Sequence, residues 1–63
     1  MIPDNAIYIP NKETPYLAVW QTEDNKIVLA LKKFYGNYQH IALDGKILPD
    51  LVDALIKIQN NEP

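Results

Sequence analysis

Alternation of apolar and polar positions predicts β-strands over the first two thirds of the chain. Four segments are rich in β-branched and aromatic residues and are separated by turn-forming residues. These segments are residues 6–9, 16–22, 26–35 and 38–43. Pro10 and Pro15 fix the ends of a loop between the first two, and residues 23–25 form a turn by composition. The pattern predicts an α+β fold, a small antiparallel β-sheet of three to four strands followed by one C-terminal α-helix.

The predicted helix begins near Leu48. Pro49 suits a first turn because its missing N–H is not needed there, and Asp50 and Lys57 carry the charges that the helix dipole favours at each end. At about 100° per residue, the apolar side chains cover roughly 200° of this helix. Packing on one small sheet would cover only about half of this apolar sector. The remaining apolar side chains therefore predict a second covering surface, either a partner copy or loops and the N-terminal arm. The expected dimer-interface residues are Leu51, Leu55 and Ile58.

A hairpin turning at Gly36 and Asn37 carries the most distinctive side chains. A two-residue turn there predicts three cross-strand pairs, because opposed residues share a face. These pairs are Tyr35 with Tyr38, Lys33 with His40, and Leu31 with Ala42. The opposite face is expected to pack on the helix, and it contains Val28, Ala30, Lys32, Phe34, Gln39, Ile41 and Leu43.

Cations interleaved with aromatic rings on an open sheet suit single-stranded nucleic acid. Bases stack on the rings at roughly 1–3 kcal/mol each, and lysines offset phosphate charge. Cross-strand tyrosines and lysines at strand ends also occur for purely structural reasons. A single tryptophan is usually a core or interface residue, and here it would share a face with Tyr16 and Ala18. The candidate nucleic-acid-binding residues are Lys32, Lys33, Tyr35, Tyr38, His40 and Trp20.

Length and composition limit how the chain can be stabilised. Its 63 residues predict a single domain, residues 1–63. A chain this short buries only roughly 60% of its unfolded surface, so disulfides, a metal or oligomerisation usually assist. The sequence has no cysteine and one histidine, which removes disulfides and most zinc sites. We therefore expect a homodimer without cofactors or metals, the alternative being a small monomer.

Charge and missing motifs restrict the function. The net charge is −2 and all basic residues are lysines, which excludes a strongly basic nucleic-acid binder but leaves room for a local basic patch. Serine is absent and there are two glycines, so neither a serine nucleophile nor a phosphate-cradling loop is available. No membrane span or signal peptide is visible. We expect a non-enzymatic, cytoplasmic protein.

The order of these segments resembles the positive-cofactor-four family of transcriptional coactivators, which bind single-stranded DNA. The matching residues are 31–35, 41–43, Leu51, Leu55 and Ile58, within about half of the chain. The resemblance implies a curved antiparallel sheet with one helix per subunit, and a homodimer joined largely through helices. It also implies a role in transcription regulation, with single-stranded DNA lying across the sheets. Lys32, Lys33, Phe34 and Tyr35 would then form the family's basic-aromatic strand end.

Two other functions fit the same residues. A small protein-interaction module, inhibiting or regulating a larger protein without binding nucleic acid, accounts for the acidic balance and the missing arginine. The third possible function is that of an α+β domain that acts only together with other chains. Salt-sensitive binding of single-stranded nucleic acid would distinguish the first function from the other two.

Overall fold

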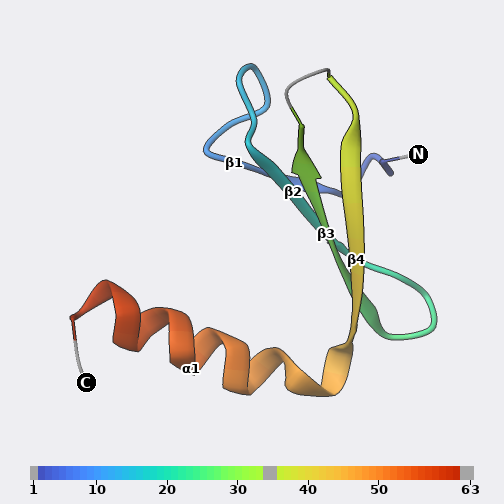
Figure 1. The fold of residues 1–63 in the computed structure, drawn as a ribbon. Helices are drawn as coiled ribbons and strands as arrows, with labels where there is room; N and C mark the ends of the chain where they lie inside the picture. The colour runs from blue at the N-terminus through green and yellow to red at the C-terminus, as the bar shows by residue number, and fades with distance from the viewer. Residues whose placement is uncertain (1, 34–35, 62–63) are drawn as a thin grey trace.

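The computed structural model describes residues 2–33 and 36–61. Within these ranges, a four-stranded antiparallel sheet precedes one C-terminal helix, which confirms the predicted α+β class (Figure 1). The strands follow one another in the order β1-β2-β3-β4. The elements are β1 (Ile7–Ile9), β2 (Leu17–Gln21), β3 (Lys26–Lys32), β4 (Tyr38–Asp44), the 3-10 turn η1 (Gly45–Ile47) and α1 (Leu48–Gln59). Among the described residues, no helix has both the length and the apolar character that a membrane span requires.

The strand register places most large aliphatic side chains on one face of the sheet and small, aromatic and charged ones on the other. Ile7, Val19, Leu29 and Ile41 form one row across all four strands, because each is the register partner of the next. Successive residues of a strand point to opposite faces. The side that we name the apolar face therefore carries Ile7, Ile9, Leu17, Val19, Ile27, Leu29, Leu31, Ile41 and Leu43. The other side, named the mixed face, carries Tyr8, Ala18, Trp20, Val28, Ala30, Lys32, Tyr38, His40 and Ala42.

The expected two-residue turn at Gly36 and Asn37 is wrong. β3 ends at Lys32, and a longer loop follows in which the Lys33 N–H donates to the Asn37 carbonyl at 2.7 Å. The Gly36 N–H donates back to the Lys33 carbonyl at 3.1 Å. Gly36 has a φ of 83°, the left-handed region that glycine adopts without steric cost. The expected partner of Tyr38, Tyr35, lies outside the described residues.

The longer loop changes the cross-strand pairs of the hairpin. His40 pairs with Ala30 instead of Lys33, Leu31 pairs with Gln39 instead of Ala42, and Lys32 pairs with Tyr38. In this register Ile27 and Leu29 lie opposite Leu43 and Ile41, which gathers these four apolar side chains on one face. Such gathering fixes a register, because a one-residue slip would move every side chain to the other face.

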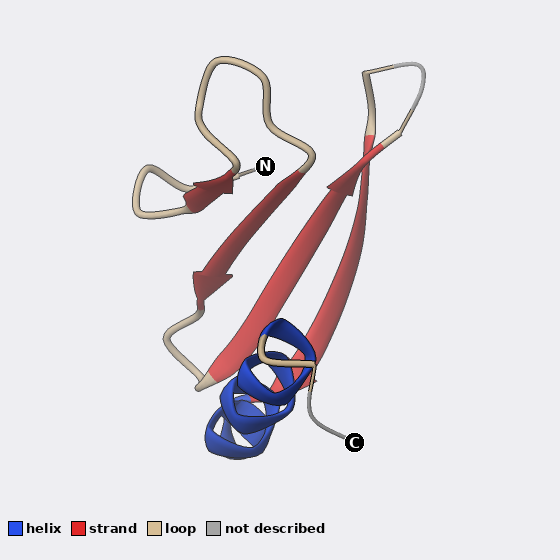
Figure 2. Ribbon diagram, turned by 90° about the vertical axis from the view of Figure 1, so that its left-hand side faces the viewer, coloured by secondary structure: helices blue, strands red, loops and turns tan. Residues whose placement is uncertain are grey.

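The helix lies against a different set of side chains from those expected. Val28, Ala30 and Lys32 belong to the mixed face, whereas the helix faces the apolar face, to which Ile41 and Leu43 belong. α1 leaves the end of β4 at a steep angle and contacts the sheet only sparsely (Figures 1 and 2). An apolar groove of about 270 Å³ lies between them. It is lined by Ile7, Ile9, Leu17, Val19, Ile27, Leu29, Leu48, Leu51, Val52 and Leu55.

A tight contact at the base of the sheet sets the direction of the helix. The Gly45 N–H donates to the Asn25 carbonyl at 2.8 Å, and the Asp44 carboxylate accepts the Lys46 N–H at 3.0 Å. Asn25 has a φ of 62°, and its side-chain oxygen accepts from the Gln21 amide at 2.7 Å. These bonds attach the start of η1 to the turn between β2 and β3. Backbone and side-chain contacts therefore hold η1, from which α1 continues, at the base of the sheet.

Replacing Gly45 by alanine should destabilise the protein. A Cβ atom at this position would lie 2.5 Å from the Asn25 carbonyl oxygen, so backbone would have to move. We expect Gly45→Ala to lower the free energy of unfolding by about 1–3 kcal/mol, as overpacking does elsewhere. Urea unfolding followed by circular dichroism measures this loss, and unchanged stability would show that the contact does not constrain η1.

The turn between β2 and β3 should also make stability depend on pH. The Thr22 hydroxyl donates to the Asp24 carboxylate and holds the pKa of Asp24 below its ordinary value. A depressed folded pKa stabilises the fold above the unfolded pKa, and this contribution is lost as the pH falls through the folded value. We expect Thr22→Val to raise the pKa of Asp24 in an NMR titration of its carboxyl group. An unchanged Asp24 titration would contradict this role of Thr22.

Candidate functional site

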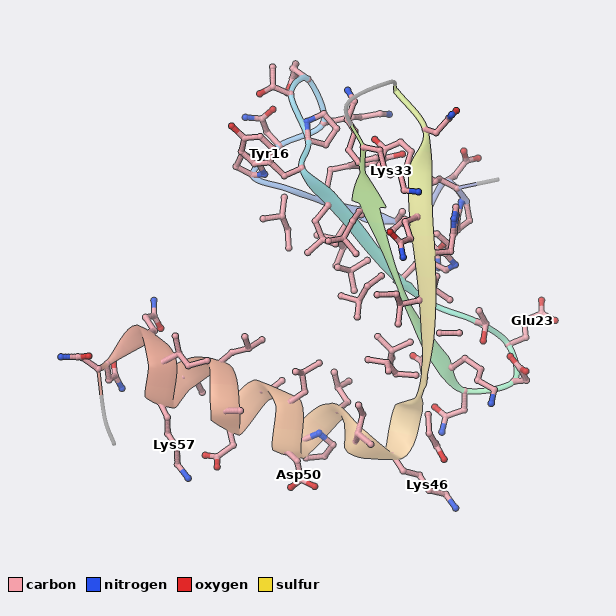
Figure 3. The ribbon with its side chains drawn as sticks, viewed as in Figure 1. Tyr16, Glu23, Lys33, Lys46, Asp50 and Lys57 are labelled. Atoms are coloured by element: carbon pink, nitrogen blue, oxygen red, sulfur yellow. The ribbon has the colours of Figure 1, made fainter. Side chains whose placement is uncertain are left out.

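A shallow depression lies at the end of the sheet away from α1. It has a volume of about 440 Å³ and combines an aromatic ring with two lysines. Figure 3 shows Tyr16 and Lys33 together at this end, with Lys46 and Lys57 far from it along the helix. The lining residues are Glu13, Thr14, Pro15, Tyr16, Lys32 and Lys33.

Backbone pairing brings these residues together from two parts of the chain. The Lys32 N–H donates to the Tyr16 carbonyl at 3.0 Å, which places the residue before β2 beside the end of β3. The Asn11 side-chain oxygen accepts the Thr14 N–H at 2.8 Å and so folds the loop between β1 and β2. Pro15 is buried, whereas Tyr16 is 77% exposed. The loop therefore presents the Tyr16 ring to solvent from a fixed backbone.

The depression is locally basic on an acidic chain. Lys32 and Lys33 face one carboxylate, Glu13, although the net charge of the whole protein is −2. Within the described residues neither lysine forms an ion pair, whereas Lys57 on the helix pairs with Asp53 at 3.2 Å. Both ammonium groups are therefore available to an anionic ligand.

The neighbouring mixed face holds a second aromatic group. Tyr8, Ala18, Ala30 and His40 form one row across the strands, and Trp20 lies in the next row with Val28 and Ala42. The Trp20 and His40 rings meet edge to face, with centroids 5.8 Å apart and planes at 75°. They belong to β2 and β4, so the pair reaches over β3 between them. The small side chains of β3 leave space for this contact.

The structure brings most of the predicted nucleic-acid-binding residues to one end or one face of the sheet. Trp20, Lys32, Tyr38 and His40 share the mixed face, and Lys33 lies in the loop that continues β3. Tyr35, the sixth predicted residue, lies outside the described residues.

The predicted dimer-interface residues do not all lie in one place. Leu51 and Leu55 line the apolar groove, whereas Ile58 lies outside it and is 75% exposed.

Tyr16 is the residue of the depression that sequence reasoning missed. The signal lay in the pairing of β2 with β3, where Leu17 is opposite Leu31 and Val19 is opposite Leu29. Aligning these leucines and valine on one face would have placed Tyr16 beside Lys32. A hairpin considered alone could not show this contact.

The described residues contain no group of three or more His, Cys, Asp or Glu side chains that could hold a metal ion. Comparison with models of known protein families, with curated proteins and with solved structures found no match. The side chains that line the depression offer an exposed aromatic ring and two ammonium groups beside one carboxylate.

Removing the His40 ring should weaken the mixed face. Aromatic pairs of this geometry contribute about 0.5–1.5 kcal/mol beyond the area that they bury. We expect His40→Ala to lower the free energy of unfolding by a similar amount and to shift the emission of Trp20, the only tryptophan. Gln39→Ala is the control, because Gln39 is adjacent in sequence but points to the apolar face. Equal effects of the two variants would contradict a specific ring contact.

Proposed function

We propose that this protein is a non-enzymatic module that binds single-stranded nucleic acid and acts as a homodimer. The observation that carries the proposal is the depression at the end of the sheet, where exposed Tyr16 lies beside Lys32 and Lys33. Tyr38, the register partner of Lys32, extends this surface onto β4. Tyrosine rings and lysine side chains therefore form a continuous surface from the loop before β2 to the mixed face of the sheet.

Single strands fit such a surface better than duplexes do. Unpaired bases offer their faces for stacking, and each stacked base contributes roughly 1–3 kcal/mol. The two lysines lie where phosphates would follow the chain of bases, and lysine binds phosphate as a point charge. Without arginine the protein lacks the bidentate contact that reads guanine, so we propose binding with little sequence preference.

The overall architecture supports a relationship to the transcriptional coactivators of the positive-cofactor-four family. An antiparallel sheet of consecutive strands followed by one C-terminal helix is the arrangement that the resemblance implies. Under this proposal the protein acts in transcription or another process that exposes single-stranded DNA in the cytoplasm. Many functions share simple α+β folds, so the proposal depends on the side chains more than on the architecture.

Reversing one charge in the depression should weaken binding. We expect Lys33→Glu to reduce affinity for a fluorescein-labelled single-stranded oligothymidylate and to lower the slope of log affinity against log salt by roughly 0.7–1. Tyr16→Ala should cost about 1–3 kcal/mol of binding free energy through lost stacking. Fluorescence anisotropy at low and moderate salt measures both effects.

Lys46→Glu is the matched control, because it makes the same charge change at the opposite end of the molecule (Figure 3). An acidic side chain before α1 is also compatible with the helix dipole. Equal affinities of Lys33→Glu, Lys46→Glu and the unmodified protein would exclude the depression as the binding site. Absence of binding even at low salt would exclude the function.

A protein-interaction module is the second candidate, and the exposed apolar surface favours it. Ile7 is 67% exposed, and Ile9, Leu31 and Ile41 on the same face are also exposed. Apolar side chains gathered on one face are typical of surfaces that bind other proteins. Under this alternative the oligonucleotide titration gives no salt-sensitive binding.

A further inference from the structure

The isolated chain exposes more surface than a compact protein of its mass. Its accessible surface is 5362 Å², whereas a folded monomer of 7.2 kDa exposes about 4,100 Å². The radius of gyration is 12.8 Å, compared with about 11 Å for a compact domain of this length. The excess of about 1,200 Å² is comparable to what one subunit buries in a permanent homodimer.

Exposed apolar side chains lie around the groove. α1 has no buried residue, and the strands on the other side of the groove keep Ile7 and Ile9 exposed. Leu51 lines the groove, and Ile58 lies two turns further along the same side of the helix. The end of the helix thus extends past the part of the sheet that its own chain provides (Figure 1).

The helix cannot cover this surface by swinging onto its own sheet without breaking contacts. Its direction is set by the Gly45 hydrogen bond to Asn25 and by the Asp44 cap on Lys46. The groove is lined by apolar side chains alone, so a charged or polar occupant would lose hydration without a compensating partner. Its occupant must therefore be an apolar surface from outside the chain.

We infer that a second copy of this chain occupies the groove. In a two-fold dimer, the second half of each helix, with Leu55, Ile56 and Ile58, lies against β1 and β2 of the other copy. One copy offers both required surfaces, an apolar helix end without a sheet and an apolar sheet without a helix. This self-complementarity is what a two-fold interface requires. If each copy buried its excess surface on association, the dimer would bury roughly 2,400 Å² in total, within the range of permanent homodimers.

This inference rests on the homodimer of the proposed function and gives it a specific interface. It does not involve nucleic-acid binding, because the groove lies on the apolar face and the mixed face stays outside the interface. Dimerisation is measured without nucleic acid, and nucleic-acid binding can be tested on a monomeric variant. A monomer would overturn the homodimer, whereas absence of oligonucleotide binding would overturn only the nucleic-acid function.

A charge placed in the groove should separate the two copies. We expect the unmodified protein to sediment as a dimer at micromolar concentration and Leu55→Lys to sediment as a monomer. Asp53→Lys introduces the same side chain on the opposite side of the helix, where Asp53 is exposed and pairs with Lys57, so it should remain dimeric. Analytical ultracentrifugation measures the mass, and circular dichroism establishes whether each variant is folded.

Cross-linking tests the arrangement without disturbing the fold. The natural chain has no cysteine, so single cysteines can be introduced cleanly. Mixing equal amounts of Ile7→Cys and Ile58→Cys and adding a short bis-maleimide should give a cross-linked pair that contains one copy of each variant. Lys46→Cys replaces Ile58→Cys in the control, because Lys46 lies on the far side of η1 from the groove (Figure 3).

A monomer at all accessible concentrations would overturn the inference. A dimer that persists in folded Leu55→Lys would also overturn it, since association would then use another surface. If Leu55→Lys fails to fold, the cross-linking decides. Equal yields from the Ile58→Cys and Lys46→Cys mixtures exclude the exchange of helix ends, and a specific yield from Ile58→Cys supports it.

Discussion

The contact between Gly45 and the Asn25 carbonyl is the constraint on which the rest of the structure depends. It leaves no room for a side chain at position 45, and it joins η1, from which α1 continues, to the turn between β2 and β3. Beyond η1, α1 runs at an angle that leaves an apolar groove between its apolar side and the sheet (Figure 1).

The sheet separates two kinds of surface. On the mixed face, small residues of β2 and β3 are covered by the side chains of their neighbours, and Ala18 and Ala30 are fully buried without a second layer. On the apolar face Ile27 is buried, whereas Ile7, Ile9, Leu31 and Ile41 stay exposed because the helix does not cover them. Small, aromatic and charged side chains are therefore kept on one side of the sheet, and most of its large aliphatic side chains lie on the other.

Much of this fold could be predicted from the sequence because its strands and helix have clear periodicities and turn residues. The hairpin could not, since Gly36 and Asn37 resemble a two-residue turn while Ile41 and Leu43 pair best with β3 through a longer loop. The turn preference of Gly36 and Asn37 favours one register of the hairpin, whereas gathering the apolar side chains on one face favours another. The structure has the register that gathers the apolar side chains. The chemistry of the candidate site was partly visible. Its lysines stand next to each other in sequence, whereas Tyr16 joins them only through pairing between strands.

The simple strand order also affects how the molecule forms. Each strand pairs with its neighbour in sequence, so the sheet can assemble from contacts that are close along the chain, and such topologies fold quickly. Covering the apolar side of α1 is a different kind of event, because no segment within residues 2–33 and 36–61 is placed to do it. Folding of the sheet is thus a first-order process, whereas completion of the structure by a second copy would be second-order. In dilute solution the encounter of two chains, more than the folding of either, would then set the time needed to reach the finished state.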